Sequence, residues 1–218
     1  QLMGDALERL ELNGVTFKAE RGQSSQTITL PETNSTKPLE FVVKNSTVVA
    51  SNNNGYACIF FCPIDATIEN STISGYAALY FKNAGVANTS EGSVVDVIDS
   101  NLIGTNVQGG KNTFGTITTE ANNVTINVSG GSITANKTND ALQTIVYCGW
   151  YAGKSTGLVA SLNTELLLGD GCRILDANED ISAQTVAGRA EYADEMAAEG
   201  FSYEMLFIDD GSNDSSWE

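Results

Sequence analysis

Apolar and polar residues alternate in a short pattern that recurs along the first two thirds of the chain. Five eight-residue segments share this pattern, and their starts differ by 31, 25, 29 and 31 residues. Their first, third and eighth positions are apolar in every case, as expected for two strands that each bury one face. The segments are LELNGVTF (10–17), FVVKNSTV (41–48), ATIENSTI (66–73), VDVIDSNL (95–102) and INVSGGSI (126–133).

The fifth position of each segment predicts a sharp bend between two strands. It holds residue types that tolerate a left-handed backbone, namely Gly14, Asn45, Asn70, Asp99 and Gly130. The seventh position is small and polar, which suits an outward strand position: Thr16, Thr47, Thr72, Asn101 and Ser132. A strand–bend–strand unit with a period of 25 to 31 residues indicates a solenoid of stacked coils. A β-sandwich with several Asn-containing turns is the alternative, and it would not require such a period.

A further strand is expected in each coil. GYACIFF (55–61) and GYAALYF (75–81) are nearly identical, and FGTITTE (114–120) and LQTIVYC (142–148) continue the pattern. Aligned in that register, an inner column is predicted from Ile59, Leu79, Ile117 and Ile145. Outward positions are predicted for Cys58, Phe60, Ala78, Tyr80, Thr116, Thr118, Thr144 and Val146.

The sequence therefore predicts an all-β fold, a single-stranded right-handed parallel β-helix of at least five coils. The right-handed path is the one that crossovers between parallel strands favour. We expect a single domain over residues 1–218, with coils over about 10–175 and a short helix-plus-strand cap over about 176–218. A last coil is a further expectation for 169–175. The cap is predicted as a helix (183–199), with Ser182 as its N-cap and Gly200 at its end, followed by a strand (201–208), and residues 1–9 as a short helix at the other end.

Composition and charge narrow the classes of partner. Hydrophobic residues make up 41% of the 218, enough for a sizeable core. Lys and Arg total 11 against 27 Asp and Glu, a net charge of −16, which disfavours nucleic acids, anionic membranes and polyanionic glycans. No apolar run reaches membrane-spanning length, so membrane insertion is not expected. Because the sequence starts at Gln1 without a signal peptide, we expect a processed product or a piece of a longer protein.

Histidine is absent, which removes the commonest general base and the commonest metal ligand. The four cysteines are Cys58, Cys62, Cys148 and Cys172. Cys58 and Cys62 would lie roughly 13 Å apart on one strand, too far for a disulfide. Cys148 and Cys172 could pair with each other or with either of these, or all four could be buried thiols.

A glycosidase of the usual kind needs two carboxylates about 5 Å or about 6.5–9.5 Å apart. The acidic side chains on or beside the segments are Asp65, Glu69, Asp96 and Asp99. Stacking places Thr67 and Asn127 beside Asp96, and Asn70 and Gly130 beside Asp99. Glu69 is expected to form a surface ion pair with Lys44. No column of two carboxylates is predicted, so these side chains are interpreted as a solvated surface.

The best candidate for ligand contact is an aromatic group that recurs in neighbouring coils: Tyr56, Phe60, Tyr76 and Tyr80. Outward rings could stack on sugars, or the protein itself could cover them. No resident cofactor or metal is predicted. Weak calcium binding is a second interpretation of the acidic tail, which carries Asp209, Asp210, Asn213 and Asp214 but lacks EF-hand spacing.

The segments LELNGVTF (10–17) and ATIENSTISGYAALYF (66–81) resemble those of pectate-lyase-like right-handed β-helix proteins, in particular bacterial surface and adhesin-type members. The resemblance covers roughly residues 10–148 and is architectural. Enzymes of this family would imply calcium-binding Asp residues with a basic catalytic residue, or clustered Asp with a Gly-His-Gly motif. The absence of histidine excludes the second set, and no Asp cluster accompanies Arg173, the one Arg near the later coils.

These features together favour a non-catalytic module, secreted or at the cell surface, that binds a neutral glycan or a protein or serves a structural role. The alternative hypothesis is a polysaccharide-acting enzyme, a lyase or glycoside hydrolase, whose site is not recognisable in the sequence. Neither hypothesis fixes the oligomeric state.

Overall fold

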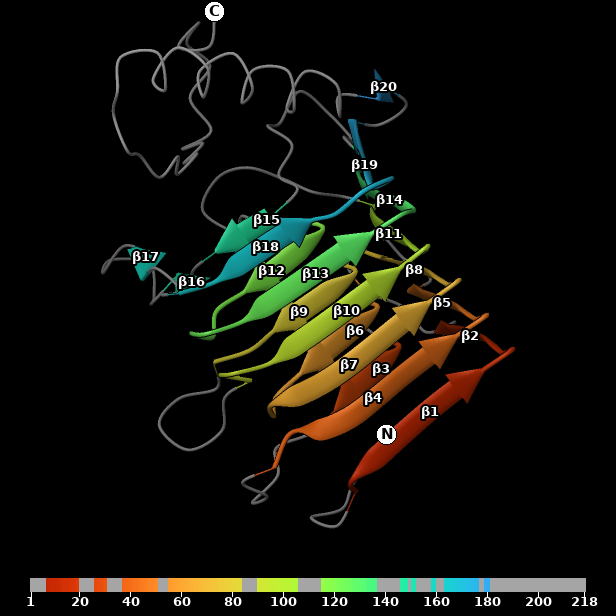
Figure 1. The fold of residues 1–218 in the computed structure, drawn as a ribbon. Helices are drawn as coiled ribbons and strands as arrows, with labels where there is room; N and C mark the ends of the chain where they lie inside the picture. The colour runs from red at the N-terminus through yellow and green to blue at the C-terminus, as the bar shows by residue number, and fades with distance from the viewer. Residues whose placement is uncertain are drawn as a thin grey trace, which may run out of the picture.

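The computed structural model describes residues 7–19, 26–30, 37–50, 55–83, 90–105, 115–136, 146–148, 150–151, 158–159, 163–176 and 179–180. These residues form a right-handed parallel β-helix built from three parallel sheets, and none of them lies in a helix. Figure 1 shows the first sheet as a row of parallel arrows from β1 to β18.

Each of the first five coils contributes one strand to each sheet, and a sixth coil adds β18 to the first sheet and β19 to the second. The first sheet contains β1 (Arg9–Asn13), β4 (Leu39–Lys44), β7 (Ile64–Glu69), β10 (Val94–Ile98), β13 (Thr125–Ser129) and β18 (Glu165–Leu168). The second contains β2 (Thr16–Ala19), β5 (Thr47–Ala50), β8 (Thr72–Gly75), β11 (Asn101–Gly104), β14 (Ser132–Ala135), β19 (Arg173–Asp176) and β20 (Glu179–Asp180). The third contains β3 (Ile28–Leu30), β6 (Cys58–Phe60), β9 (Leu79–Phe81), β12 (Ile117–Thr119) and β15 (Val146–Cys148), while β16 (Trp150–Tyr151) and β17 (Leu158–Val159) form an antiparallel pair.

The five repeated segments stack in the predicted register. Leu10 pairs with Phe41, and the column continues through Ala66, Val95 and Ile126 to Leu166. The eighth positions stack from Phe17 to Ile133 and on to Ile174. From the second coil onward these columns are almost wholly buried, and they form one continuous core with the third sheet. Strand pairing and apolar burial therefore propagate together along the stack.

The bend at the fifth position is left-handed in every repeated segment, as predicted. The φ angles are 66° at Gly14, 49° at Asn45, 46° at Asn70, 47° at Asp99 and 66° at Gly130. A left-handed residue costs an ordinary side chain roughly 1–2 kcal/mol, and Gly, Asn and Asp carry that cost best. The choice of these residue types is therefore a direct backbone requirement of the corner.

A buried serine ladder satisfies the backbone immediately after this bend. The Ser71 Oγ accepts a hydrogen bond from the Ser46 N–H at 3.1 Å, and the Ser100 Oγ accepts one from the Ser71 N–H at 3.0 Å. The Ser46 Oγ does the same for the Val15 N–H at 3.2 Å. Each hydroxyl also donates to a carbonyl two residues earlier in its own coil, at 2.6–2.7 Å. The ladder thus links neighbouring coils at a corner where strand pairing is interrupted.

The ladder stops at the fifth coil, where Gly131 replaces serine. A Cβ added to Gly131 would lie 1.9 Å from the Ser100 carbonyl oxygen, and its φ is +63°. The sixth coil, expected near 169–175, is confirmed by β18 and β19, with a left-handed residue at Gly171 (φ 73°). Its corner contains one more residue than the others, which explains its poor fit to the eight-residue pattern.

The corner that leads into the first sheet changes type along the stack. Pro38 and Pro63 precede β4 and β7, whereas the equivalent positions in the next three coils are left-handed: Gly92 (φ 76°), Asn123 (φ 56°) and Asn163 (φ 53°). The Asn163 side-chain amide donates to the Asn123 side-chain oxygen at 3.0 Å, so this corner also carries a polar link between coils. Proline restricts φ to about −65°, so the second and third coils have a different backbone conformation at this corner.

The predicted register of the third sheet is confirmed where Leu79 pairs with Ile117 but is wrong by one residue on either side of this pair. Cys58, not Ile59, pairs with Leu79, and Val146, not Ile145, pairs with Ile117; Ile145 itself lies outside the described residues. The Tyr76 N–H donates to the Gly55 carbonyl, whereas the Ala57 N–H donates to the Ala77 carbonyl. Two residues, Tyr76 and Ala77, therefore oppose Tyr56 alone, as in a β-bulge, and the extra residue shifts the strand that follows.

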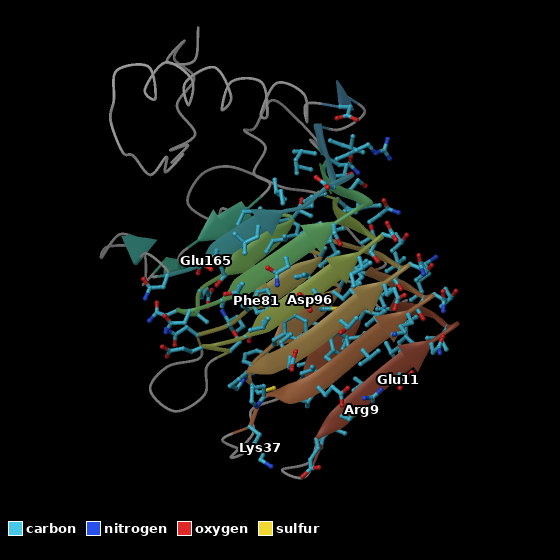
Figure 2. The ribbon with its side chains drawn as sticks, viewed as in Figure 1. Arg9, Glu11, Lys37, Phe81, Asp96 and Glu165 are labelled. Atoms are coloured by element: carbon cyan, nitrogen blue, oxygen red, sulfur yellow. The ribbon has the colours of Figure 1, made fainter. Side chains whose placement is uncertain are left out.

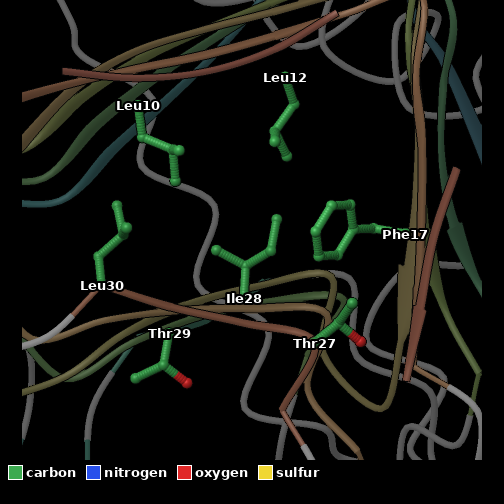
Figure 3. Close-up of a pocket in the computed structure, with 7 residues that line it drawn as sticks. All are labelled: Leu10, Leu12, Phe17, Thr27, Ile28, Thr29 and Leu30. Atoms are coloured by element: carbon green, nitrogen blue, oxygen red, sulfur yellow. The ribbon is translucent and has the colours of Figure 1, made fainter. Parts of the chain in front are cut away.

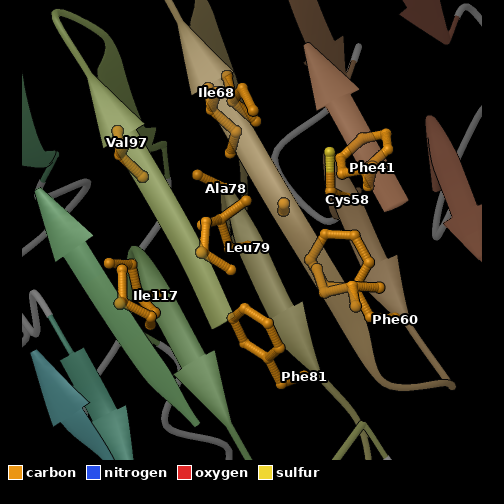
Figure 4. Close-up of a cluster of buried hydrophobic side chains, with 14 of the residues drawn as sticks. Phe41, Cys58, Phe60, Ile68, Ala78, Leu79, Phe81, Val97 and Ile117 are labelled. Atoms are coloured by element: carbon orange, nitrogen blue, oxygen red, sulfur yellow. The ribbon is translucent and has the colours of Figure 1, made fainter. Parts of the chain in front are cut away.

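This shift reverses several predicted orientations. Cys58, Phe60 and Ala78 belong to the core, where Figure 4 shows them beside Leu79 and Phe81. The Phe60 ring lies 5.1 Å from the Phe81 ring and 5.7 Å from the Phe41 ring, between ring centroids. Val146 also packs against this core. Ile59, predicted to face inward, instead joins a separate small cluster with Tyr80, which lies outside the main core as predicted.

Of the elements predicted at the two ends of the chain, one is wrong where the structure describes it and the other lies outside the described residues. Arg9 begins β1, so the helix predicted over residues 1–9 is wrong at its end, and residues 1–6 lie outside the described part of the chain. The predicted cap helix (183–199) and strand (201–208) also lie outside it, as does Thr144.

Replacing Ser71 by alanine tests the serine ladder. The Ser46 N–H would lose its acceptor inside the protein, so we expect Ser71→Ala to lower the free energy of unfolding by about 1–3 kcal/mol in denaturant titrations. Thr72→Ala, one position further on and partly exposed, is the control and should cost less than about 0.5 kcal/mol. Equal losses in the two variants would contradict a specific role for the ladder.

Candidate binding site on the third sheet

The outer faces of the three sheets differ sharply in chemistry. The first sheet presents charged side chains, among them Arg9, Glu11, Asp96 and Glu165 (Figure 2). In its first five strands, the second sheet presents neutral residues apart from Lys18: Thr16, Thr47, Val49, Thr72, Ser74, Asn101, Ile103, Ser132 and Thr134. The third sheet presents Ile59, Tyr80 and Thr118, all less than 5% exposed. Of these three residues only Tyr80 is aromatic, and it lies outside the main core as the sequence predicted.

Three tyrosines meet beside β6 and β9. The Tyr56 ring lies 6.0 Å from the Tyr76 ring at an interplanar angle of 81°, and 4.9 Å from the Tyr80 ring at 60°. Such edge-on and tilted packing is favourable for aromatic pairs. Tyr76 and Tyr80 are buried, with 9% and 4% of their surface exposed, whereas Tyr56 and Phe61 are half-buried. The structure thus brings three of the four predicted aromatic residues together and places the fourth, Phe60, in the core.

A polar network lies against these rings. The Tyr80 hydroxyl donates to Glu120 Oε1, and Lys82 Nζ lies 2.7 Å from Glu120 Oε2 and 2.9 Å from the Tyr80 hydroxyl oxygen. The ammonium also lies 4.7 Å from the centre of the Tyr80 ring, a cation–π geometry. Only 24% of the Lys82 side chain and 11% of the Glu120 side chain are exposed, so this ion pair is more shielded than the others described.

Lys82 and Glu120 were missed by the sequence interpretation because each directly follows its strand, β9 or β12. The pairing of β9 with β12 brings these two residues, 38 positions apart, to the same end of neighbouring strands. The sequence signal for this ion pair was the opposite charge of two residues, each of which stands one position beyond the end of its predicted strand.

Burial raises the pKa of all three tyrosine hydroxyls above the ordinary value of 10, so they are protonated at neutral pH. It raises the pKa of Tyr56 to about 12, with smaller contributions from Tyr76 and from the negative charge of Glu120. Burial also raises the pKa of Tyr76, and the pKa of Tyr80 rises through burial first and then through the charge and hydrogen bond of Glu120. The site therefore presents neutral phenols beside one cation and one anion.

The predicted carboxylates form no such cluster, but one neighbouring pair was overlooked. Lys44 Nζ lies 2.8 Å from Glu69 Oε2, which confirms the expected surface ion pair. Asp96 accepts a hydrogen bond from the Asn127 amide at 2.7 Å, and Asp99 occupies the left-handed corner. Contrary to the prediction of no carboxylate column, Glu40 and Asp65 pair in register, one position before the repeated segments.

The Glu40–Asp65 pair lacks the surroundings of a catalytic acid. Both side chains are exposed on the open outer face of the first sheet, and Glu40 forms an ion pair with Arg9. A general acid is usually held protonated by apolar surroundings, which this face does not provide. The pair therefore fits a solvated, ion-paired surface.

The cysteines in the described part of the chain carry free thiols. Cys58 and Cys62 are buried, Cys172 is half-buried, and none of these three is in a disulfide. Burial raises the pKa of Cys62 to about 11 and raises that of Cys58 further, which makes both thiols unreactive at neutral pH. The side chain of Cys148 lies outside the described set.

Among the described residues, no group of three or more His, Cys, Asp or Glu side chains is arranged to hold a metal ion. Asp209, Asp210, Asn213 and Asp214 lie outside those residues. No helix in the described ranges is long and apolar enough to cross a membrane.

Three comparisons with known proteins were negative. No protein-family model, no curated protein and no solved structure matches this chain.

The raised pKa of Tyr56 predicts a loss of stability at alkaline pH. Because the folded pKa is about 12 and the unfolded value about 10, the stabilisation is complete below pH 10 and is lost as pH rises from 10 towards 12. In Tyr56→Phe, which has no ionisable hydroxyl, we expect a smaller fall of the unfolding free energy over this interval. Denaturant titrations at pH 8, 10 and 11 measure the difference. Parallel pH curves for the two proteins would contradict the assigned cause.

Proposed function

We propose that this chain is a non-catalytic binding module of a secreted or cell-surface protein, and that its ligand is a neutral glycan. The observation that carries the proposal is the third-sheet site, where tyrosine rings lie against a shielded Lys82–Glu120 pair. Apolar ring faces beside a fixed donor and a fixed acceptor match the two surfaces of a sugar, its C–H face and its hydroxyls.

Tyr56 and Lys82 are the groups through which a ligand would make contact. Tyr56 is half-buried and Lys82 is about a quarter exposed. The Tyr76 and Tyr80 rings pack against Tyr56, and the Tyr80 ring also packs against Lys82. Lys82 would donate to a sugar hydroxyl and Glu120 would accept from one. Because both are held by the Tyr80 hydroxyl in this structure, little side-chain ordering would accompany binding.

Charge supports a neutral ligand. The net charge is −16, and the carboxylates on the outer face of the first sheet include Glu11, Glu40, Asp65, Glu69 and Asp96. A polyanionic glycan would be repelled by this field at low ionic strength. Proteins remain the second class of ligand, and the neutral outer face of the second sheet is the surface that suits them.

The alternative, a polysaccharide-acting enzyme, is supported by the Glu40–Asp65 neighbours alone. Two carboxylates on adjacent strands satisfy the residue types of a glycosidase, but their exposure and the ion pair with Arg9 do not favour it. Product analysis on any bound glycan decides between these functions.

Binding can be tested with an array of neutral and anionic glycans, followed by titration calorimetry on the tightest neutral ligand. We expect Tyr56→Ala and Lys82→Gln each to raise the Kd about tenfold or more, because one removes a stacking ring and the other a charged donor. Val94→Ala is the control, since Val94 is 40% exposed on a different sheet, and its Kd should equal that of the wild type.

Two results would contradict the proposal. Release of new reducing ends or unsaturated products from a bound glycan would identify an enzyme; Glu40→Gln and Asp65→Asn would then be the variants to assay. Preference for anionic over neutral glycans, or binding unaffected by both Tyr56→Ala and Lys82→Gln, would place the ligand elsewhere.

A further inference from the structure

The first coil leaves the interior of the solenoid open at its N-terminal end. A cavity of about 240 Å³ is lined there by Leu10, Leu12, Phe17 and residues 27–30. Figure 3 shows the inward side chains of β1, β2 and β3 around this common space. Phe17 is 47% exposed, although the residues that stack below it in the same column, from Val48 to Ile133, are fully buried.

The same end carries unpaired sheet edges. Among the described strands, β1, β2 and β3 each stand last in their sheets, so one edge of each faces outward along the solenoid axis. At every other boundary between coils, this kind of surface is covered by another coil through strand pairing and apolar contact. Open edges beside exposed apolar side chains are a surface that proteins normally cover.

The serine ladder offers no hydrogen bond to a further coil at this place. Each ladder serine offers its Oγ to the coil before it, and the ladder's first member accepts from the Val15 N–H. Val15 itself stands at the serine position of the first coil and has no hydroxyl to offer. A coil of the same type stacked on the first would therefore lack this hydrogen bond, as the boundary between the fourth and fifth coils lacks it at Gly131.

Charge favours a second copy as the occupant. The described residues of the first coil carry two acidic and two basic side chains, Glu8, Glu11, Arg9 and Lys18. At the opposite end, the residues of 163–180 whose side chains are described include three acidic ones, Glu165, Asp170 and Asp180, against one basic one, Arg173. In a chain of net charge −16, two copies meet with least repulsion through their first coils.

One of the three sheets already has its far edge paired at the opposite end of the stack. β20 pairs antiparallel with β19, so Leu175 and Asp176 at the far edge of the second sheet already have strand partners. An N-terminal end stacked on this far end would meet an occupied edge at the second sheet. Contact between two N-terminal ends instead gives a closed dimer, because a twofold interface uses the same surface patch on both copies.

We propose that the N-terminal end of the solenoid is a self-association surface, through which two copies pair by their first coils around Phe17. Each copy covers the open cavity of the other, and the edges of their sheets face each other.

Sedimentation velocity over a concentration series of the chain, with a reducing agent to prevent disulfides, tests the proposal. We expect a reversible monomer–dimer equilibrium. Phe17→Asp should raise the dimer Kd at least ~30-fold, because the twofold interface loses two buried rings and gains two charges. Leu167→Asp is the matched control, since Leu167 is 53% exposed at the other end of the stack, and it should dimerise like the wild type.

Three results would overturn the proposal. They are a wild-type chain that stays monomeric at its highest soluble concentration, a series of species beyond the dimer, or equal dimer affinities for the wild type and Phe17→Asp. Circular dichroism and thermal unfolding show whether each variant is folded. If Phe17→Asp is not, Phe17→Ser replaces it with a side chain that a strand tolerates, and the same comparison applies.

Discussion

The backbone bend between the first and second sheets is the constraint on which the rest of the molecule depends. A left-handed residue turns the chain at this corner in five coils, and in the first three of them the N–H that follows donates to a serine hydroxyl of the next coil. Where the fifth coil has Gly131 in place of serine, the corner keeps the same length. The left-handed bend therefore keeps the strand–corner–strand unit at eight residues in these five coils, so the variation in coil length falls in the other two corners. The outward faces can then differ in chemistry while the inner columns stay apolar.

The sequence predicted the first two sheets closely because their register follows from apolar alternation together with a residue type that the backbone demands. Position five was recognisable from Gly14 to Gly130 because few residues tolerate a positive φ. The serine column beside it was visible in the same segments but was not interpreted, since small polar residues are usually assigned to the surface. Ser71 and Ser100 are buried because hydrogen bonds across coils satisfy them.

The third sheet shows where sequence reasoning fails. GYACIFF and GYAALYF match best at a spacing of 20, but the pairing of Cys58 with Leu79 has a spacing of 21. A bulge at Tyr76 and Ala77 accounts for the difference, and similarity between segments cannot reveal an extra residue that only one coil accommodates. With a side-chain period of two, that residue moves Phe60 into the core and Ile59 to the outer face. The candidate site was therefore only partly predictable: Tyr56, Tyr76 and Tyr80 follow from the pattern, whereas Lys82 and Glu120 meet only once the pairing is known.

The direction of the strand pairing has a mechanical consequence. Hydrogen bonds between coils run along the solenoid axis, so a pull between the two ends of the stack loads them in tension, one coil boundary at a time, and not in shear. A coil released from the stack frees 25 to 31 residues in the early part of the chain, which extend by about 80–110 Å at the reach of an extended backbone. A stack of this kind lengthens in steps under load, and each step dissipates work while the remaining coils stay folded.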